Sequence, residues 1–534
     1  MIRRALAAWS AALTLACAAL GGPGAGVAHA QTVTVDGGLA EGVSLPSGVD
    51  AWLGLPFAAP PLRELRWQPP QPVTPWQGTF HADRFAPECL QALRSPRQNH
   101  YFGNEATSED CLYLNIWAPQ GARAKLPVVV WIYGGGFNIG SASMANYSGE
   151  PLAKAGVIRV NIAYRVGPLG FFAHPELSRE SGYNGSGNYG LMDQIAALQW
   201  VRRNIAQFGG DPDNVTIVGQ SAGSMSVALL QQSPLAKGLF QRVVGMSGSP
   251  FGGMIGPAPL AKAEAQGMAL QKELGAASLA DLRALPGDKV AAATSPRDAI
   301  VLDGKVLTGT AEQTFAARAQ SDVPVLIGYT RDESFRPFGP ITTPEQLAAA
   351  VRERFPAEAD AVLAAYAGTD PARAAADIAR DSTAGRQMLL WAAAQQHNGK
   401  APAYAYLFTR RQPYAPGVTF SDHDPASVGA YHTGDVPYWL RTRDALNLFR
   451  VTRNWEAGDA ALEAEMSGAL LAFARTGVPV SPALGRWPAF DPAKPRLVWL
   501  GTDSKVVPWP HSADMGLFGD AAAAPRPAGN RPRD

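Results

Sequence analysis

One tight turn constrains the fold of this chain more than any other feature. Residues 219–223 read Gly-Gln-Ser-Ala-Gly, after an apolar β-branched run at 215–218 and before a helical stretch at 224–232. A serine between two glycines at a strand-to-helix turn is typical of a nucleophile elbow, whose backbone is strained at the serine. Larger side chains at the two glycines would collide with neighbouring elements. The pattern therefore predicts Ser221 above a sheet edge, at a helix N-terminus that favours negative charge.

Apolar runs and helical patterns alternate along much of the chain. Residues 193–208 carry apolar side chains at spacings of three and four, and a Gly-Gly-Asp-Pro run at 209–212 ends this helix. The alternation predicts a mostly parallel sheet covered by helices on both faces. An Ala-rich region at 346–386 predicts a helical excursion from the sheet. The predicted strands lie at 128–133, 157–164, 215–218, 243–246 and 323–328, with a late one near 403–408.

The first thirty residues have the pattern of a signal peptide. Two arginines precede an apolar run at 5–20, and Ala-His-Ala at 28–30 is a small-x-small cleavage site. A membrane anchor is the alternative, but it needs about 20 apolar residues. A lipoprotein anchored through Cys17 is a further alternative, with a poor lipidation sequence before it. We therefore expect a signal peptide at 1–30, a folded domain at 31–518, a disordered tail at 519–534, and a secreted or periplasmic protein.

Composition narrows the classes of function. The 534 residues carry a formal net charge of +1, and no basic run favours nucleic acid or an anionic membrane. The sequence has no dinucleotide fingerprint, no P-loop and no cysteine and histidine cluster with zinc spacing. We therefore expect no metal, no organic cofactor, no membrane span and no nucleic-acid partner.

Three consecutive glycines, 134–136, follow the predicted strand at 128–133. Glycines leave backbone N–H groups unobstructed, so such a loop can surround a developing oxyanion. We predict that the N–H groups of Gly135 and Gly136, with that of Ala222 after the serine, form the oxyanion hole.

Several long blocks resemble the type-B carboxylesterases, the family that includes cholinesterases and liver carboxylesterases. The blocks lie at 109–115, 134–137, 164–171 and 187–223, and the resemblance spans roughly 32–518, dense up to 249 and thin afterwards. It implies an α/β-hydrolase fold and hydrolysis of small-molecule esters by a serine nucleophile.

The resemblance also implies the partners of Ser221. In this fold the acid and then the histidine follow the nucleophile. The acid is predicted at Glu333, with Asp332 as the alternative. The base is predicted at His432, in a loop with Thr433 where the family has glycine; His423 is the nearest rival. A carboxylate beside the imidazole fixes its tautomer and stabilises the imidazolium.

Further residues are assigned by the same resemblance. Ser247 and Asp435 are expected to hydrogen-bond near the triad, where ordinary structural roles are equally compatible with the sequence. Arg66 is expected to pair with Glu109. Gln220 stands where cholinesterases carry Glu, which argues against a choline-ester specialist.

The cysteines predict one disulfide. If Cys17 leaves with the signal peptide, Cys89 and Cys111 remain, and an exported chain with two cysteines usually pairs them. Two free buried thiols are the alternative.

Together these features predict a serine carboxylesterase with a Ser-His-Glu triad and an acyl-enzyme intermediate. The alternatives are a lipase-like hydrolase of longer acyl esters and a non-catalytic binding member of the family.

Overall fold

The computed structural model describes residues 30–91, 105–123, 125–252, 256–296, 298–333, 338–421 and 423–519. The predicted signal peptide and tail lie outside these ranges, apart from Ala30 and Gly519. Within these ranges, no helix is long and apolar enough to cross a membrane.

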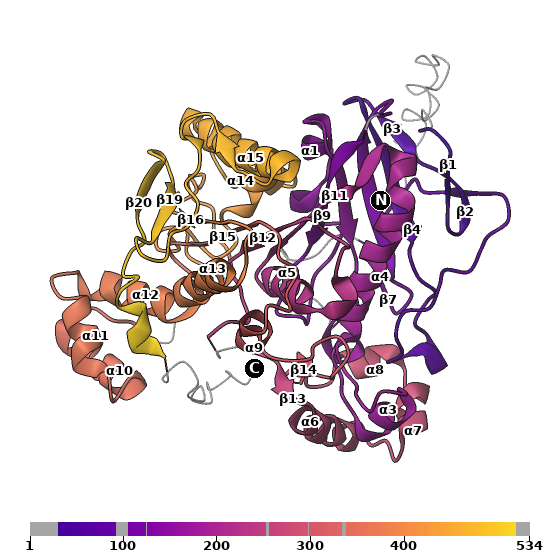
Figure 1. Cartoon of the computed structure of the whole chain (residues 1–534), viewed down its shortest axis with the longest axis horizontal. Coiled ribbons are helices and arrows are strands. Elements are labelled where there is room, and N and C mark those ends of the chain that lie inside the picture. Colours follow the sequence, from indigo (N-terminus) through magenta and orange to yellow (C-terminus); the bar gives the residue numbers. More distant parts are fainter. Residues whose placement is uncertain are drawn as a thin grey trace, which may run out of the picture.

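A large twisted sheet forms the centre of the molecule (Figure 1). Seven neighbouring strands, β19 to β10 in the order below, run parallel, and antiparallel strands flank them on both sides. The predicted mostly parallel sheet is confirmed. The strands in spatial order are β20 Lys505–Pro508, β19 Arg496–Leu500, β16 Ala403–Phe408, β15 Val325–Thr330, β12 Arg242–Met246, β11 Gly210–Gln220, β9 Leu126–Ile132, β10 Ile158–Ile162, β8 Tyr113–Pro119, β4 Val49–Pro56 and β3 Val43–Leu45.

Helices cover both faces of this sheet, as predicted. Helices α4 (Tyr189–Asn204), α5 (Ala222–Gln232) and α13 (Arg386–Asn398) pack on one face, whereas α1 (Glu150–Lys154) and α15 (Ala457–Thr476) pack on the other. The remaining α-helices are α2 Gly167–Gly170, α3 Pro175–Glu180, α6 Leu260–Glu273, α7 Leu279–Ala284, α8 Gly287–Ala291, α9 Ala311–Ala316, α10 Pro344–Arg354, α11 Ala359–Ala365, α12 Pro371–Arg380 and α14 Val436–Leu440.

Short strands form small additional sheets around the main one. They are β1 Val33–Val35, β2 Gly38–Glu41 and β5 Thr79–His81; β6 Glu88–Cys89 with β7 Thr107–Ser108; β13 Ala258–Pro259 with β14 Val301–Leu302; and β17 Val480–Ser481 with β18 Gly485–Arg486.

The Ala-rich region is helical, as predicted, but it is not one continuous helix. It consists of α10, α11 and α12, and a five-residue π-helix, Asp381–Gly385, joins α12 to α13. Helices α10 to α12 have their own small apolar core, which includes Val351, Phe355 and Ile378. In Figure 1 they project from the main body at lower left. This helical segment is therefore stabilised in part by its own apolar contacts.

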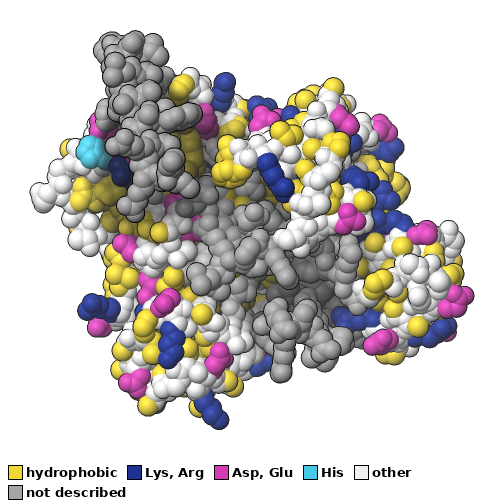
Figure 2. Space-filling view, turned by 180° about the vertical axis from the view of Figure 1, so that it is seen from behind, with side chains coloured by type: hydrophobic (Ala, Val, Ile, Leu, Met, Phe, Trp, Pro, Cys, Tyr) yellow, Lys and Arg dark blue, Asp and Glu magenta, His cyan; other side chains and the backbone are white. Residues whose placement is uncertain are grey.

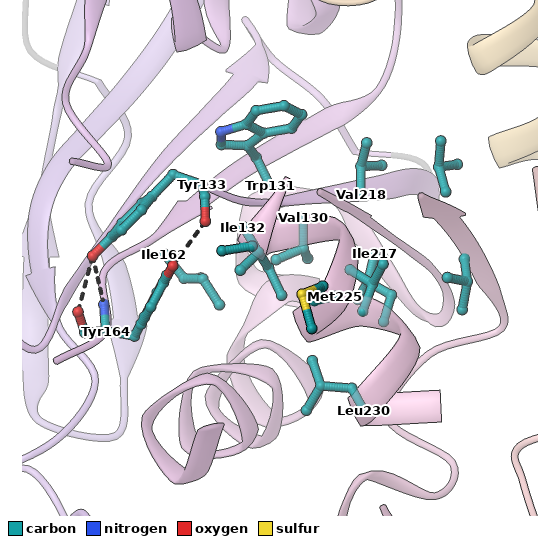
Figure 3. Close-up of a cluster of buried hydrophobic side chains, with 14 of the residues drawn as sticks. Val130, Trp131, Ile132, Tyr133, Ile162, Tyr164, Ile217, Val218, Met225 and Leu230 are labelled. Atoms are coloured by element: carbon teal, nitrogen blue, oxygen red, sulfur yellow. Dashed lines mark hydrogen bonds between the residues drawn. The ribbon is translucent and has the colours of Figure 1, made fainter. Parts of the chain in front are cut away.

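Part of the main apolar core lies between β9, β11 and α5. Figure 3 shows Val130 and Ile132 packed beside Ile217 and Met225. At the ends of β9 and β10, Tyr133 and Tyr164 stack with ring centroids 4.4 Å apart. Each phenol donates a hydrogen bond to the other residue's carbonyl oxygen, at 2.9 and 2.8 Å. These contacts fix the point from which the triple-glycine loop departs.

The strand order places a functional site at one edge of the sheet. From β9 the chain adds β10 on one side and β11 on the other, so the direction of winding reverses between them. Open α/β sheets bind ligands at the carboxyl ends of their strands, at such a reversal. Among the described residues on the face shown in Figure 2, acidic and basic side chains are interspersed, and no large area carries a single sign of charge.

Candidate active site

The turn between β11 and α5 has the strained geometry that the sequence predicts. Ser221 has φ 58° and ψ −123°, and its N–H donates to the carbonyl oxygen of Met246 at 2.8 Å. A Cβ atom on Gly219 would lie 2.2 Å from the Gly223 carbonyl oxygen. One on Gly223 would lie 2.1 Å from the Ile132 carbonyl oxygen. Both distances are far inside van der Waals contact, so these two positions require glycine.

Ser221, His432 and Glu333 form a continuous hydrogen-bonded line. The Ser221 Oγ lies 2.8 Å from His432 Nε2, and His432 Nδ1 donates to the Glu333 carboxylate. The other Glu333 oxygen accepts the N–H of Thr330 at 2.9 Å, which fixes the carboxylate at the end of β15. Both His432 and Glu333 are buried. The structure thus brings together the three residues predicted as nucleophile, base and acid.

The electrostatics of this line favour a charged imidazole. Burial lowers the pKa of His432, but the negative charges of Glu333 and Asp435 outweigh this effect and raise the pKa above its ordinary value. An imidazolium that forms when Ser221 loses its proton is therefore stabilised in place.

The residues 429–435, called the His432 loop below, are fixed by polar side chains from other segments of the chain. The Gln220 side-chain amide donates to the His432 carbonyl oxygen at 2.8 Å. Asp332 accepts the N–H of Ala430 at 2.8 Å and forms an ion pair with Arg373. Asp332, the alternative acid, therefore anchors the loop instead of contacting the imidazole.

The structure also bears on the alternative base, His423, and on Thr433 beside His432. His423 stacks on Phe420, with ring centroids 4.4 Å apart, and lies 3.0 Å from the Tyr414 hydroxyl oxygen. Thr433, where the family has glycine, adopts no positive φ, so this position does not require glycine.

The triple-glycine loop lies directly against the elbow. A Cβ atom on Gly134 would lie 2.5 Å from the Gln220 carbonyl oxygen. Gly135 and Gly136 have φ of +116° and +63°, and their N–H groups have no hydrogen-bond partner among the described residues. Ala222 is the first residue of α5, so its N–H has no partner within the helix. Ala222 directly follows Ser221, and Gly135 and Gly136 follow the glycine that contacts the elbow, so the predicted oxyanion-hole residues lie close to the nucleophile.

Asp435 and Ser247, which the resemblance places near the triad, are both buried. Asp435 accepts the Tyr406 hydroxyl at 2.7 Å, and burial raises the pKa of Asp435 to about 6. Its second oxygen has no hydrogen-bond partner among the described residues. Ser247 follows β12 with φ 56°, and its N–H donates to the Gly328 carbonyl oxygen at 2.8 Å. The Ser247 hydroxyl likewise lacks a partner in the described part of the chain, so the side-chain hydrogen bond predicted for Ser247 near the triad is absent there.

Sequence reasoning missed two supporting residues, Tyr406 and Gln412, and the anchoring role of Asp332. Tyr406 lies in the late strand β16, and Asp332 acts through the loop backbone. Gln412 donates to the Gly434 carbonyl oxygen at 3.0 Å and accepts the Tyr431 hydroxyl at 3.0 Å. None of them carries a local motif, because each contact joins segments that only the fold brings together.

The predicted contacts at the early loop are present. Cys89 and Cys111 form a disulfide. Arg66 donates two hydrogen bonds to the Glu109 carboxylate, at 2.8 and 2.6 Å. Arg66 also donates to the carbonyl oxygen of Leu285 at 2.8 Å, so the pair joins the early segment to the region after α7. Across the residues that the structure describes, no three His, Cys, Asp or Glu side chains gather as metal ligands.

The reversing sheet, the strained serine after β11 and the acid and histidine after later strands define an α/β-hydrolase. The chain belongs to the carboxylesterase family, since a sequence model of the Carboxylesterase family matches residues 29–354 and 367–514. It is 38% identical over 484 residues to fumonisin B1 esterase of Sphingopyxis macrogoltabida, covering 87% of this chain and 84% of that protein. It is 33% identical over 491 residues to para-nitrobenzyl esterase of Bacillus subtilis, covering 86% and 92%.

Solved structures agree. A structure titled PNB esterase superposes with a TM-score of 0.74 at 31% identity, covering 91% of this chain and 99% of that one. A second structure of PNB esterase gives a TM-score of 0.76 with the same identity and coverage. The chain is therefore a carboxylic ester hydrolase with an α/β-hydrolase fold.

Proposed function

We propose that this enzyme hydrolyses carboxylic esters through an acyl-enzyme on Ser221. His432 Nε2 accepts the Ser221 proton as Oγ attacks the ester carbonyl carbon. The N–H groups of Gly135, Gly136 and Ala222 stabilise the tetrahedral oxyanion. His432 then donates the proton to the departing alcohol oxygen. Water, deprotonated by His432, attacks the acyl-enzyme and releases the acid, so the serine is regenerated.

The 2.8 Å separation between Ser221 Oγ and His432 Nε2 carries this proposal. It is hydrogen-bond distance, the requirement for a general base. Glu333 supports the role by accepting from the opposite ring nitrogen, which leaves Nε2 free to accept the serine proton. The non-catalytic alternative requires loss of part of this line, and all three groups are present.

The direct test is Ser221→Ala, with the exposed Ser427→Ala as the matched control. We expect Ser221→Ala to lower kcat by roughly 10⁶-fold while the protein stays folded, because the residues act as a unit. Ser427→Ala should behave as the unaltered enzyme. A fluorophosphonate should label Ser221 alone, as read by mass spectrometry of the tryptic peptide. Label on another serine, or substantial turnover by Ser221→Ala, would contradict the proposal.

For the substrate we propose neutral esters over choline esters. Gln220 is uncharged where cholinesterases carry Glu, and residues 89–111 include no Trp to form a cation–π platform. One relative, at 32% identity, is nevertheless an acetylcholinesterase from Bungarus fasciatus. We expect kcat/KM for a neutral ester at least equal to that for the choline ester of the same acid. A preference of about 100-fold for the choline ester, roughly 2.7 kcal/mol, would reverse this proposal.

The lipase-like alternative concerns acyl length. Human bile salt-activated lipase is 46% identical over 239 residues, which cover 42% of this chain and 30% of that protein. A series of p-nitrophenyl esters from two to sixteen carbons separates the two functions. A short-chain optimum supports the carboxylesterase, whereas a steep rise with chain length supports the lipase.

We also propose export through the segment at 1–30. Cell fractionation and N-terminal sequencing test it: we expect the mature protein outside the cytoplasm, beginning at Gln31. A cytoplasmic protein that retains Met1 would refute export.

A further inference from the structure

One loop exposes an unusual amount of apolar surface. Between the 3₁₀-helix Arg443–Asn447 and α15, Leu448, Phe449 and Val451 are 59%, 82% and 63% exposed. Exposed single apolar residues are common on proteins, but adjacent large ones mark interaction sites. We define residues 448–451, Leu-Phe-Arg-Val, as the apolar tip.

The base of the apolar tip is firmly closed. The Asn447 side-chain oxygen accepts the N–H groups of Thr452 and Arg453, at 2.8 and 2.9 Å. Its amide nitrogen donates to the Arg453 carbonyl oxygen at 2.9 Å, and the Thr452 hydroxyl donates to the Leu446 carbonyl oxygen at 2.6 Å. The tip is thus presented on an ordered stem, so little conformational entropy remains to be lost when it binds.

The charge of the apolar tip is positive. Arg450 is its only ionisable residue, and the guanidinium lies 5.3 Å from the centre of the Phe420 ring and donates to the Thr419 carbonyl oxygen at 3.0 Å. Neither of these two contacts brings a carboxylate to the guanidinium. At a phospholipid surface, phosphates lie just outside the acyl chains. Apolar side chains can enter the acyl region while a neighbouring guanidinium contacts the phosphates.

The apolar tip stands at the same edge of the sheet as the site. Its base residue Arg453 donates to the Gln412 side-chain oxygen at 2.9 Å and to the Tyr431 hydroxyl, and Tyr431 directly precedes His432. Asn454 donates to the Pro413 carbonyl oxygen at 2.8 Å. Gln412 and Pro413 follow the carboxyl end of β16, as the His432 loop does.

We propose that the apolar tip docks the enzyme on a phospholipid surface. Leu448, Phe449 and Val451 enter the boundary between headgroups and acyl chains, and Arg450 pairs with lipid phosphate. Docking turns the carboxyl edge of the sheet toward esters dissolved in the lipid. This inference goes beyond the proposed function and is independent of its mechanism, because it concerns where the enzyme binds rather than how Ser221 reacts.

Vesicle binding tests the proposal. The probes are phosphatidylcholine vesicles and vesicles with 30% phosphatidylglycerol, and the readout is the bound fraction after flotation. The triple variant Leu448→Ser, Phe449→Ser, Val451→Ser should lose at least tenfold in partition coefficient on both. Met268→Ser, which removes a 56% exposed apolar side chain on α6, is the matched control and should bind as the unaltered protein. All variants share one N-terminus, so any binding through it cancels.

Charge gives a second, separate readout. Arg450→Gln should weaken binding to the phosphatidylglycerol vesicles about fivefold, and 0.5 M salt should remove most of this difference. For every variant, kcat/KM on soluble p-nitrophenyl acetate should stay unchanged, which separates this proposal from the catalytic one. Equal binding by the triple variant overturns the proposal, as does no binding by the unaltered protein. Light scattering that shows a dimer lost in the triple variant, without vesicle binding, overturns it in favour of self-association.

Discussion

The elbow and the His432 loop fix two halves of one site by different means. At the elbow, backbone atoms at the end of β9 and the start of α5 leave no room for a Cβ on Gly219 or Gly223. At the His432 loop, side chains far away in the chain supply the constraint: Gln220, Asp332 and Gln412 each hydrogen-bond its backbone or side chains. The nucleophile is therefore positioned by steric exclusion, and the base by a set of polar contacts, each of which can be removed singly.

The strongest test of this difference is to add one methyl group to the elbow. Gly223→Ala should cost at least about 3 kcal/mol of unfolding free energy, because the Ile132 carbonyl oxygen belongs to the central strand and cannot retreat. Gly458→Ala is the control, since a Cβ there meets nothing within 4 Å. Urea denaturation measures both. A Gly223→Ala protein with an unchanged urea midpoint and slope would show that the elbow can accommodate a Cβ atom at this position.

The next test removes one polar anchor of the His432 loop. Asp332→Ala should lower kcat about 10²-fold with little change in KM, because a base displaced by about 1 Å loses that much. Asp332→Asn keeps an acceptor for the Ala430 N–H and loses only the charge opposite Arg373, so we expect about a tenfold loss. Equal losses in the two variants would mean that the ion pair alone positions the loop.

The contrast also explains what sequence could predict. The elbow, the strands β9, β11 and β12, and α4 with the 3₁₀-helix Ile205–Phe208 that follows it agree with local patterns of glycine, β-branched residues and spacing. The disulfide and the Arg66–Glu109 pair followed from cysteine number and from family resemblance. These features depend on the chain nearby or on motifs that stay together.

The rest depends on which distant segments meet. Strand β11 begins at Gly210 and not at Val215, because Gly210 pairs with Leu126 of β9 across an irregularity. The antiparallel strands β8 and β4 lie beside the parallel strands, but their residues do not alternate strictly between buried and exposed, so the sequence does not mark them as strands. Asp332 is a second candidate acid in the sequence, because the sequence does not show that it pairs with Arg373, which lies 41 residues later.

A smaller effect is expected from a charge between the two regions. Gln220→Glu replaces the donor to the His432 carbonyl oxygen by a carboxylate that cannot donate, which should cost roughly tenfold in kcat/KM at pH 6. The added negative charge should also raise the pKa of His432, so the acid limb of the pH–rate profile moves to higher pH. Gln220→Met, which removes the donor without adding charge, should show the loss without the shift. Identical profiles for the two variants would contradict this account.

The smallest effect concerns stability. The pKa of Asp435, about 6 in the folded protein against an ordinary 3.8, means that the folded state holds its proton more tightly. The unfolding free energy therefore falls as pH rises from about 4 to about 6. Asp435→Asn should remove this fall and, after the cost of burying the amide, stabilise the protein by about 1 kcal/mol at pH 7. Urea curves at pH 4.5 and 7 measure it, with the exposed Asp213→Asn as control. An unchanged pH slope would mean that Asp435 is charged without penalty.

The order of strands in the sheet has a consequence for biosynthesis. The partner of β12 on its outer side is β15, which starts about 80 residues after β12 ends, and ribosomes add roughly 5–20 residues per second. For several seconds the nascent chain therefore carries a hydrophobic strand, β12, that can pair with β11 on one edge but has no partner on the edge that β15 later covers. Open strand edges recruit other chains. The yield of this protein in a heterologous host should thus depend on chaperones that cover nascent segments, more than on the stability of the finished fold.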